Sequence, residues 1–226
     1  MNPEELKSAR RARGWSQAEA SRRLGVSQPY YSQIETGARP VTARISQQLA
    51  RRLRLPPSSL PLPPLSADLL PLSPQMLASG LARLGHPGFS HEPRSRNPRN
   101  PALLIAGALA HSDLEPRLVS ALPWVLARCQ PLDWDWLSAQ CRLSNLQNRL
   151  GFLLALAEPL ALPEAKPSLR AARLVLENSR LAREGTLCRD SMPAAERQWL
   201  RRNRSSSARH WRLLTSLHSG EIASRE

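Results

Sequence analysis

Two pairs of side chains have residue types that catalysis uses. Asp133 and Asp135 lie two residues apart in PLDWDWLSAQC, and neighbouring carboxylates can serve general acid–base chemistry. They stand at the start of a predicted helix, where carboxylates interact favourably with the helix dipole, so capping explains them better. His91 and Glu92 are followed by Pro93 and lack the second histidine of H-E-x-x-H. We therefore expect no enzyme activity and no catalytic residue.

The sequence also favours a chain without metal, cofactor or disulfide. Cys129, Cys141 and Cys188 are odd in number and form no C-x-x-C pair, which is typical of reduced structural thiols. The longest apolar run, residues 101–110, is shorter than the roughly 18 residues of a membrane span. The first residues lack the apolar core of a signal peptide. We expect a cytoplasmic protein that does not bind membranes.

The segment 16–40, SQAEASRRLGVSQPYYSQIETGARP, meets the geometric requirements of a helix-turn-helix. Ser16 can cap a first helix, with Glu19 as its reciprocal partner in a capping box. Gly25 supplies the positive φ that ends this helix and turns the chain. Ser27 can then cap a second helix, which the spacing predicts over residues 27–35.

The second helix is predicted to have one buried and one exposed face. Tyr31 and Ile34 are three residues apart and face the first helix, whereas the polar positions between them face outward. Residues 1–56 contain eleven basic and four acidic residues, which is half of the net charge of +14. This surplus indicates an acidic partner such as nucleic acid.

These features resemble the Cro/C1 (XRE-type) repressor family. The resemblance rests on LKSARRARGWSQ, LGVSQ, IETG and ARISQQLARRL, and covers about the first 55 residues. It implies a five-helix bundle with helices near 3–13, 16–24, 27–35 and 42–52 and a short last element. Two positions depart from the family pattern, Ala20 where Leu is common and Tyr31 where Ile or Val is common. We expect the large residue to offset the small one in the core.

The resemblance also implies that helix 27–35 reads the major groove of double-stranded DNA. The implied DNA-binding residues are Gln17, Ser27, Gln28, Pro29, Tyr30, Ser32, Gln33 and Arg39. Gln28 is the best candidate for base reading, because its amide can bridge N6 and N7 of adenine. Gln17 and Arg39 would bind phosphates and set the register on the duplex. Arg10 and Glu35 would form a partly buried, structural ion pair.

The rest of the chain reads as a linker and a second domain. Seven prolines between residues 55 and 75 favour an extended chain, so we assign 56–99 to a Pro-rich linker with a short helix near 76–84. Helical apolar spacing predicts helices near 101–111, 116–129, 134–142, 145–157, 168–184, 193–203 and 206–217. Asp133, Ser144 and Ser168 are candidate N-caps, and Pro123 should kink or split its helix. The predicted fold is all-α, with a head at 1–55 and a separate helical domain at 100–226 for dimerisation, sensing or partner binding.

A second group of basic residues lies in the segment 197–212, RQWLRRNRSSSARHWR. Arg197, Arg201 and Arg204 fall on one predicted helical face, which would suit a DNA backbone. Thirty of the 32 basic residues in the chain are arginine, however, so an ordinary solvated surface explains this face better.

Together these patterns predict a bacterial-type, sequence-specific DNA-binding transcriptional regulator. We expect a homodimeric, nucleoid-associated repressor that reads a palindromic operator, since the two-fold of a dimer matches two half-sites. Two alternatives remain open. One is an antitoxin-like autoregulator whose C-terminal helices bind a partner protein, and the other is an enzyme activity in the helical domain.

Overall fold

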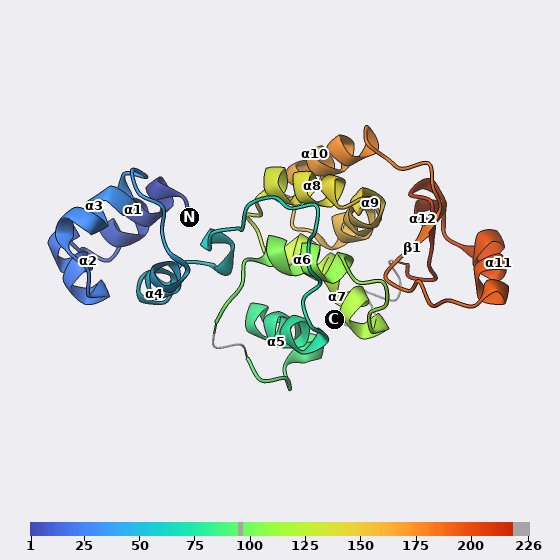
Figure 1. Cartoon of the computed structure of the whole chain (residues 1–226), viewed down its shortest axis with the longest axis horizontal. Helices are drawn as coiled ribbons and strands as arrows, with labels where there is room; N and C mark the ends of the chain where they lie inside the picture. Colours follow the sequence, from blue (N-terminus) through green and yellow to red (C-terminus); the bar gives the residue numbers. More distant parts are fainter. Residues whose placement is uncertain (95–96, 219–226) are drawn as a thin grey trace. The chain divides into compact units, whose positions relative to one another are not determined.

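The computed structural model describes residues 1–94 and 97–218, which fold into two compact units. The first unit contains Met1–Pro63 together with Asn97–Asn100, and the second contains the rest of the described chain. Both units are built from helices (Figure 1), so the predicted all-α class is confirmed. The only strands among the described residues are two pieces of two residues each.

The first unit is a bundle whose helices begin at polar caps. Its elements are α1 (Pro3–Arg11), α2 (Gln17–Leu24), α3 (Gln28–Glu35), α4 (Ala43–Leu53) and the 3-10 turn η1 (Pro57–Ser59). Each of the four helices has a polar residue before it whose side chain accepts a hydrogen bond from a backbone N–H of the first turn. These caps are Asn2, Ser16, Ser27 and Thr42. Because these donors have no partner inside the helix, each cap stabilises its helix by about 1 kcal/mol. The short fifth element of the head is a single 3-10 turn.

The core of the first unit draws side chains from all four α-helices. The buried cluster consists of Leu6, Ala20, Leu24, Tyr31, Ile34, Leu49 and Leu53. Ala20 and Tyr31, the two departures from the family pattern, are both fully buried in it. A small residue on α2 and a large one on α3 therefore share the same core.

One detail of the predicted capping box is wrong. Ser16 accepts the N–H of Glu19 as expected, at 3.1 Å. The carboxylate of Glu19 pairs with Arg22 and with Arg23 Nε, the latter at 2.6 Å, instead of reaching back to the cap. Two arginines on the same helix face compete successfully for it, because they lie three and four residues further along the helix.

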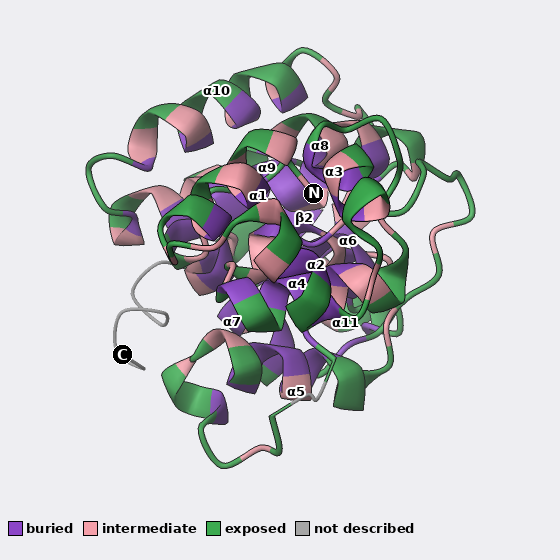
Figure 2. Ribbon diagram, turned by 90° about the vertical axis from the view of Figure 1, so that its left-hand side faces the viewer, coloured by how far each residue is buried: buried purple, intermediate pink, exposed green. Residues whose placement is uncertain are grey.

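The second unit surrounds α9, a helix that is buried along most of its length. Its elements are α5 (Pro74–Leu84), η2 (Pro87–Phe89), α6 (Pro101–Leu109), α7 (Pro116–Arg128), α8 (Trp134–Leu143), α9 (Gln147–Ala157), η3 (Glu158–Leu160), α10 (Lys166–Glu177), β1 (Gly185–Thr186), α11 (Ala194–Asn203), α12 (Ser206–His210) and β2 (Leu213–Leu214). Helices α7, α8 and α10 all pack against α9. In Figure 2, α10 is buried on one side and exposed on the other, as expected of an outer helix.

Two predicted helices are shorter in the structure than in the sequence analysis. The helix predicted over 168–184 is α10, which ends at Glu177, and the one predicted over 206–217 is α12, which ends at His210. After each helix the chain turns and then forms a short strand, and β1 pairs in parallel with β2 through Gly185↔Leu213 and Thr186↔Leu214. Strands this short carry no alternation of apolar and polar residues, so their sequence did not reveal them.

Four expectations about helix caps and helix breaks can also be compared with the structure. Asp133 caps α8 by accepting the N–H of Trp136 at 2.9 Å. Ser144 instead lies at the C-terminal end of α8, and Ser168 lies inside α10, where its hydroxyl donates to the carbonyl of Ala165. Pro123 lies within α7 and does not split it.

Part of the Pro-rich segment is bound to the second unit. Ser66 and the side chain of Gln140 exchange two hydrogen bonds, of 3.0 and 2.6 Å. The N–H of Leu72 donates to the carbonyl of Gly107 at 3.2 Å, and a ring nitrogen of His111 lies 2.6 Å from the carbonyl of Leu72. An extended segment has no partners of its own for its backbone polar groups, so Gln140, Gly107 and His111 satisfy some of them.

The glycine at position 151 permits the closest packing in the second unit. Gly151 is buried in α9, and Trp211, which is 1% exposed, packs directly against it. A Cβ at position 151 would lie only 2.3 Å from two carbon atoms of the indole ring. No other residue type fits there without displacing the ring.

We predict that Gly151→Ala destabilises the protein. Overpacking a core costs up to about 3 kcal/mol, which exceeds the roughly 1 kcal/mol that alanine gains over glycine inside a helix. Urea unfolding followed by circular dichroism should therefore show a net loss of about 2 kcal/mol. Gly185→Ala is the matched control, because its Cβ would make only an ordinary contact of 3.8 Å with Leu213. Equal effects of the two substitutions would contradict the steric explanation.

Candidate nucleic-acid interface

A tight turn joins α2 to α3. Gly25 ends α2 with φ +67°, a left-handed conformation that glycine adopts without strain. The N–H of Val26 returns to the carbonyl of Ser21 at 3.0 Å, which closes the end of α2. Ser27 then caps α3, so that two residues separate the last residue of α2 from the cap. The two helices pack against each other and form a helix-turn-helix.

Helix α3 has one buried and one exposed face. Tyr31, Ile34 and Glu35 are buried against the rest of the head. Most of the candidate DNA-binding residues lie on the opposite side: Ser27, Gln28, Pro29 and Gln33 are exposed, and Tyr30 and Ser32 are half-buried. This face offers amide and hydroxyl groups to a partner, and amides can donate and accept hydrogen bonds at the edge of one base.

The loop after α3 returns one arginine to this exposed face. The N–H of Arg39 donates to the carbonyl of Gln33 at 3.2 Å. The guanidinium of Arg39 lies over the ring of Tyr30, 4.8 Å from its centroid. A cation held on an aromatic face is restricted in position but keeps its N–H donors. Arg39 and Tyr30 therefore lie next to each other, and their contacts with the DNA backbone stay predictions.

An ion pair holds the C-terminal end of α3. Arg10 Nε lies 2.6 Å from Glu35 Oε1, and Arg10 Nη2 lies 3.2 Å from Glu35 Oε2. Arg10 Nη1 also donates to the carbonyl of Trp15 at 2.6 Å. Both charged residues are buried, being 8% and 4% exposed. The pair thus connects α1, the α1–α2 loop and α3.

Gln17 takes part in this network. Its Nε2 donates to Glu35 Oε2 at 2.6 Å, so the first residue of α2 is bonded to the last residue of α3. The sequence predicts that Gln17 binds a phosphate and gives no sign of this bond, since nothing in the spacing brings residues 17 and 35 together. Its role as a phosphate contact stays a prediction.

Hydrogen bonding sets the ionisation of this pair. Burial raises the pKa of Glu35, but the hydrogen bonds from Arg10 and Gln17 and the charge of Arg10 outweigh it and hold that pKa below its ordinary value. The hydrogen bond to Glu35 raises the pKa of Arg10. Both groups are therefore charged at neutral pH, and each neutralises the other.

The second basic group serves the fold of the second unit. Arg197 donates to the backbone carbonyls of Met192 and Asp190, at 3.0 and 2.6 Å. Arg201 pairs with Glu184 at 2.8 Å, and Arg204 donates to the carbonyl of Leu213. These arginines hold the chain around α11 and the short sheet, a role beyond the solvated surface that the sequence analysis favoured.

No cluster of metal-ligating residues occurs within 1–94 and 97–218. None of the helices described there is long and apolar enough to span a membrane. Burial raises the pKa of Cys129 and Cys141 to about 12 and that of Cys188 to about 11, so all three thiols are protonated at neutral pH.

The geometry of the head defines a helix-turn-helix of the DNA-binding class. Comparison with known families agrees, because residues 6–60 match a helix-turn-helix family model. The resemblance to the Cro/C1-type fold is thereby confirmed for this segment. No curated protein and no solved structure matches the chain.

We predict that Glu35→Gln strongly destabilises the head. The amide cannot neutralise the buried guanidinium of Arg10, and breaking a buried pair from one side costs about 3–5 kcal/mol. Urea unfolding at pH 7 measures the loss. Glu4→Gln is the matched control on α1, because the Glu4 side chain is 81% exposed and lies 3.8 Å from Lys7. Such an exposed pair contributes less than about 1 kcal/mol.

The same variant gives a pH test. Because the folded-state pKa of Glu35 is lowered, its stabilisation is complete above its unfolded-state pKa of about 4.3 and is lost as the pH falls through the folded value. The difference in stability between the natural protein and Glu35→Gln should therefore shrink in acid. A difference that stays constant from pH 7 to pH 3 would show that the charge of Glu35 does not stabilise the fold.

Proposed function

We propose that this protein is a sequence-specific DNA-binding transcriptional regulator that represses by occupying a palindromic operator. The observation that carries the proposal is the exposed polar face of α3 (Gln28–Glu35), which a fully packed opposite face holds in place. Helix-turn-helix proteins use such a face in the major groove. The helix-turn-helix match at residues 6–60 supports the DNA-binding class.

Most residues of the interface have a proposed task. Gln28, at the first turn of α3, would bridge N6 and N7 of adenine, a contact worth about 1–3 kcal/mol of discrimination. Ser32 and Gln33 would face neighbouring base edges. Arg39, Tyr30 and the start of α2 at Gln17 would contact phosphates, which position the head without reading sequence.

A single head reads too little DNA to be specific in a genome. Helix α3 has eight residues and is about 12 Å long, and stacked base pairs are about 3.4 Å apart, so it spans only three or four of them. Two copies related by a two-fold axis would double the site. We therefore propose a homodimer acting on nucleoid DNA in the cytoplasm, with the second unit supplying self-association.

We predict that two substitutions in the full chain separate base reading from phosphate binding. Gln28→Ala should relax sequence preference at one position of each half-site by about 1–3 kcal/mol. Arg39→Ala should weaken binding to all sequences. It should also make the negative slope of log K against log salt shallower by about one, because one phosphate contact is lost. Selection from genomic DNA fragments, followed by titration at several salt concentrations, measures both.

The matched controls are Gln198→Ala and Arg202→Ala, two exposed residues of α11 in the other unit. They should change neither specificity nor salt dependence. Enrichment of a palindrome by the natural protein supports the operator, and enrichment of single half-sites contradicts the dimer. Equal loss of affinity in Gln28→Ala and Arg39→Ala, without a change in preference, would contradict the division of roles.

A further inference from the structure

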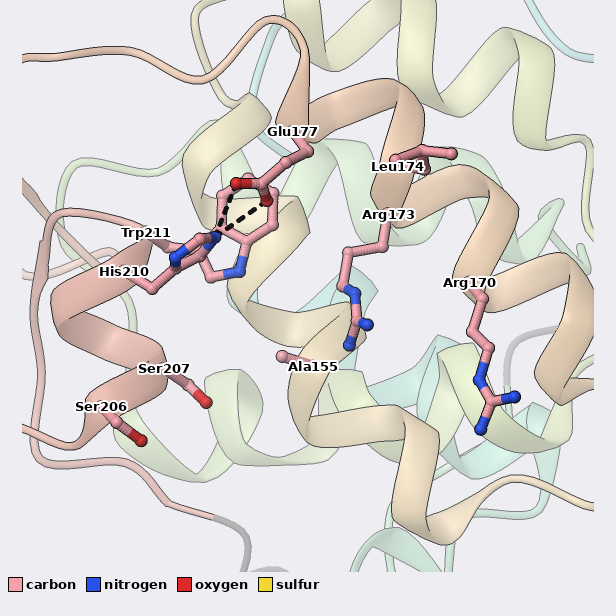
Figure 3. A pocket seen from close by; sticks show the side chains of 9 residues that line it. All are labelled: Ala155, Arg170, Arg173, Leu174, Glu177, Ser206, Ser207, His210 and Trp211. Atoms are coloured by element: carbon pink, nitrogen blue, oxygen red, sulfur yellow. Dashed lines mark hydrogen bonds and ion pairs between the residues drawn. The ribbon is translucent and has the colours of Figure 1, made fainter.

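The second unit contains a large pocket between α9, α10 and α12. It has a volume of about 710 Å³, which lies within the range of small-molecule sites. Figure 3 shows that its walls come from three segments that are distant in sequence: Ala155 of α9, the side chains of α10 from Arg170 to Glu177, and Ser206 to Trp211 at α12. None of these residues takes part in the helix-turn-helix.

One end of the pocket carries a surplus of positive charge. Arg170 Nε and Arg173 Nη1 share the carboxylate of Glu158, at 2.6 and 2.7 Å. Two guanidiniums thus face one carboxylate, which leaves a net charge of about +1 and several N–H donors beyond those that Glu158 accepts. The arginine side chains are 63% and 39% exposed, so this charge is open to a ligand.

At the opposite end of the pocket, a carboxylate is paired with a guanidinium. His210 Nε2 lies 2.7 Å from Glu177 Oε1, and Arg180 Nη1 lies 3.2 Å from the same oxygen. Arg180 also donates to the carbonyl of His210 at 3.0 Å. The charges of Glu177 and Arg180 cancel at neutral pH. A bound anion would consequently be drawn to the end at Arg170 and Arg173.

The space between the two ends has apolar and hydroxyl surfaces. The indole of Trp211 is fixed against Gly151 and forms a rigid part of the wall beside Ala155. Leu174, at the rim, is 64% exposed although it is a large apolar residue. Ser206 and Ser207 add hydroxyl groups on the α12 side (Figure 3). An apolar body lying here would cover Leu174 and gain free energy from its burial.

We propose that this pocket binds a small organic carboxylate with an apolar body. The carboxylate would accept hydrogen bonds from Arg170 and Arg173, which suits the fork of a guanidinium. The body would lie along Ala155 and Leu174, in front of the buried indole of Trp211, and one negative charge would match the net charge of the arginine end. The site is independent of DNA binding, so its test and that of the proposed function can fail separately.

The test is isothermal titration of the full chain with phenylacetate, indole-3-acetate and hexanoate. At least one should bind saturably with one site per chain, while phenylacetamide and inorganic phosphate bind at least about tenfold more weakly, since each lacks either the charge or the apolar body. Arg173→Gln and Arg170→Gln should each weaken binding about tenfold or more. Each variant leaves Glu158 paired with the other arginine, so the fold is retained. Arg128→Gln, at an exposed position of α7, is the matched control and should bind like the natural protein.

Each possible result of the titrations either supports or contradicts the proposed carboxylate site. Binding of phosphate as tightly as the carboxylates would replace the proposal with a simple anion site, and equal binding of phenylacetamide would show that charge is not recognised. Equal weakening by Arg128→Gln would place the ligand elsewhere. Absence of saturable binding by all three carboxylates would overturn the proposal. Thermal unfolding without ligand, unchanged in every variant, verifies that the fold is intact.

Discussion

The position of α3 depends on the buried charge pair of Arg10 and Glu35. The guanidinium of Arg10 binds both carboxylate oxygens of Glu35 and the carbonyl of Trp15, and the amide of Gln17 completes the network. One charge pair therefore connects α1, the loop after it, α2 and the last residue of α3. The cost of burying two charges is offset only when such bonds are complete, so the network tolerates little displacement. Because the Ser27 cap holds the other end of α3, the exposed face is presented in one orientation.

In the second unit an arginine also connects several elements, but it binds backbone carbonyls. Its loops and short strands contain backbone carbonyls that no helix satisfies, and a buried carbonyl without a partner is costly. Arg149 of α9 donates to the carbonyls of Leu109, His111 and Thr186, at 2.7, 2.6 and 2.9 Å. The end of α6 and the strand β1 are thus tied to the central helix. The same helix carries Gly151, which admits the indole of Trp211 and so shapes one wall of the pocket.

Local chemistry made much of this fold predictable. Caps, Gly25 and apolar spacing act within four or five residues, and most of the helices they predict lie within a few residues of the observed ones; α10 and α12 are the exceptions, because both end well before the predicted residue. The bond between Gln17 and Glu35 and the pairing of β1 with β2 depend on residues 18 and 28 positions apart, which no spacing rule relates. Ser168 was a plausible cap by type, yet α10 begins earlier, at Lys166. The pocket could not be predicted from spacing either, because its walls come from three segments that are distant in sequence.

The arginines show why net charge alone does not locate a nucleic-acid interface. The chain has a large surplus of positive charge, but several arginines use their N–H donors inside the fold. Arg10, Arg149 and Arg197 donate hydrogen bonds to carboxylates and backbone carbonyls of their own unit. Arg39 differs, because its guanidinium lies over the face of Tyr30, and this contact leaves its N–H donors in place. A phosphate needs those donors as well as the charge. Arg39 is consequently the arginine that the proposed interface uses, whereas Arg197 and Arg204 around α11 donate to backbone carbonyls of the second unit.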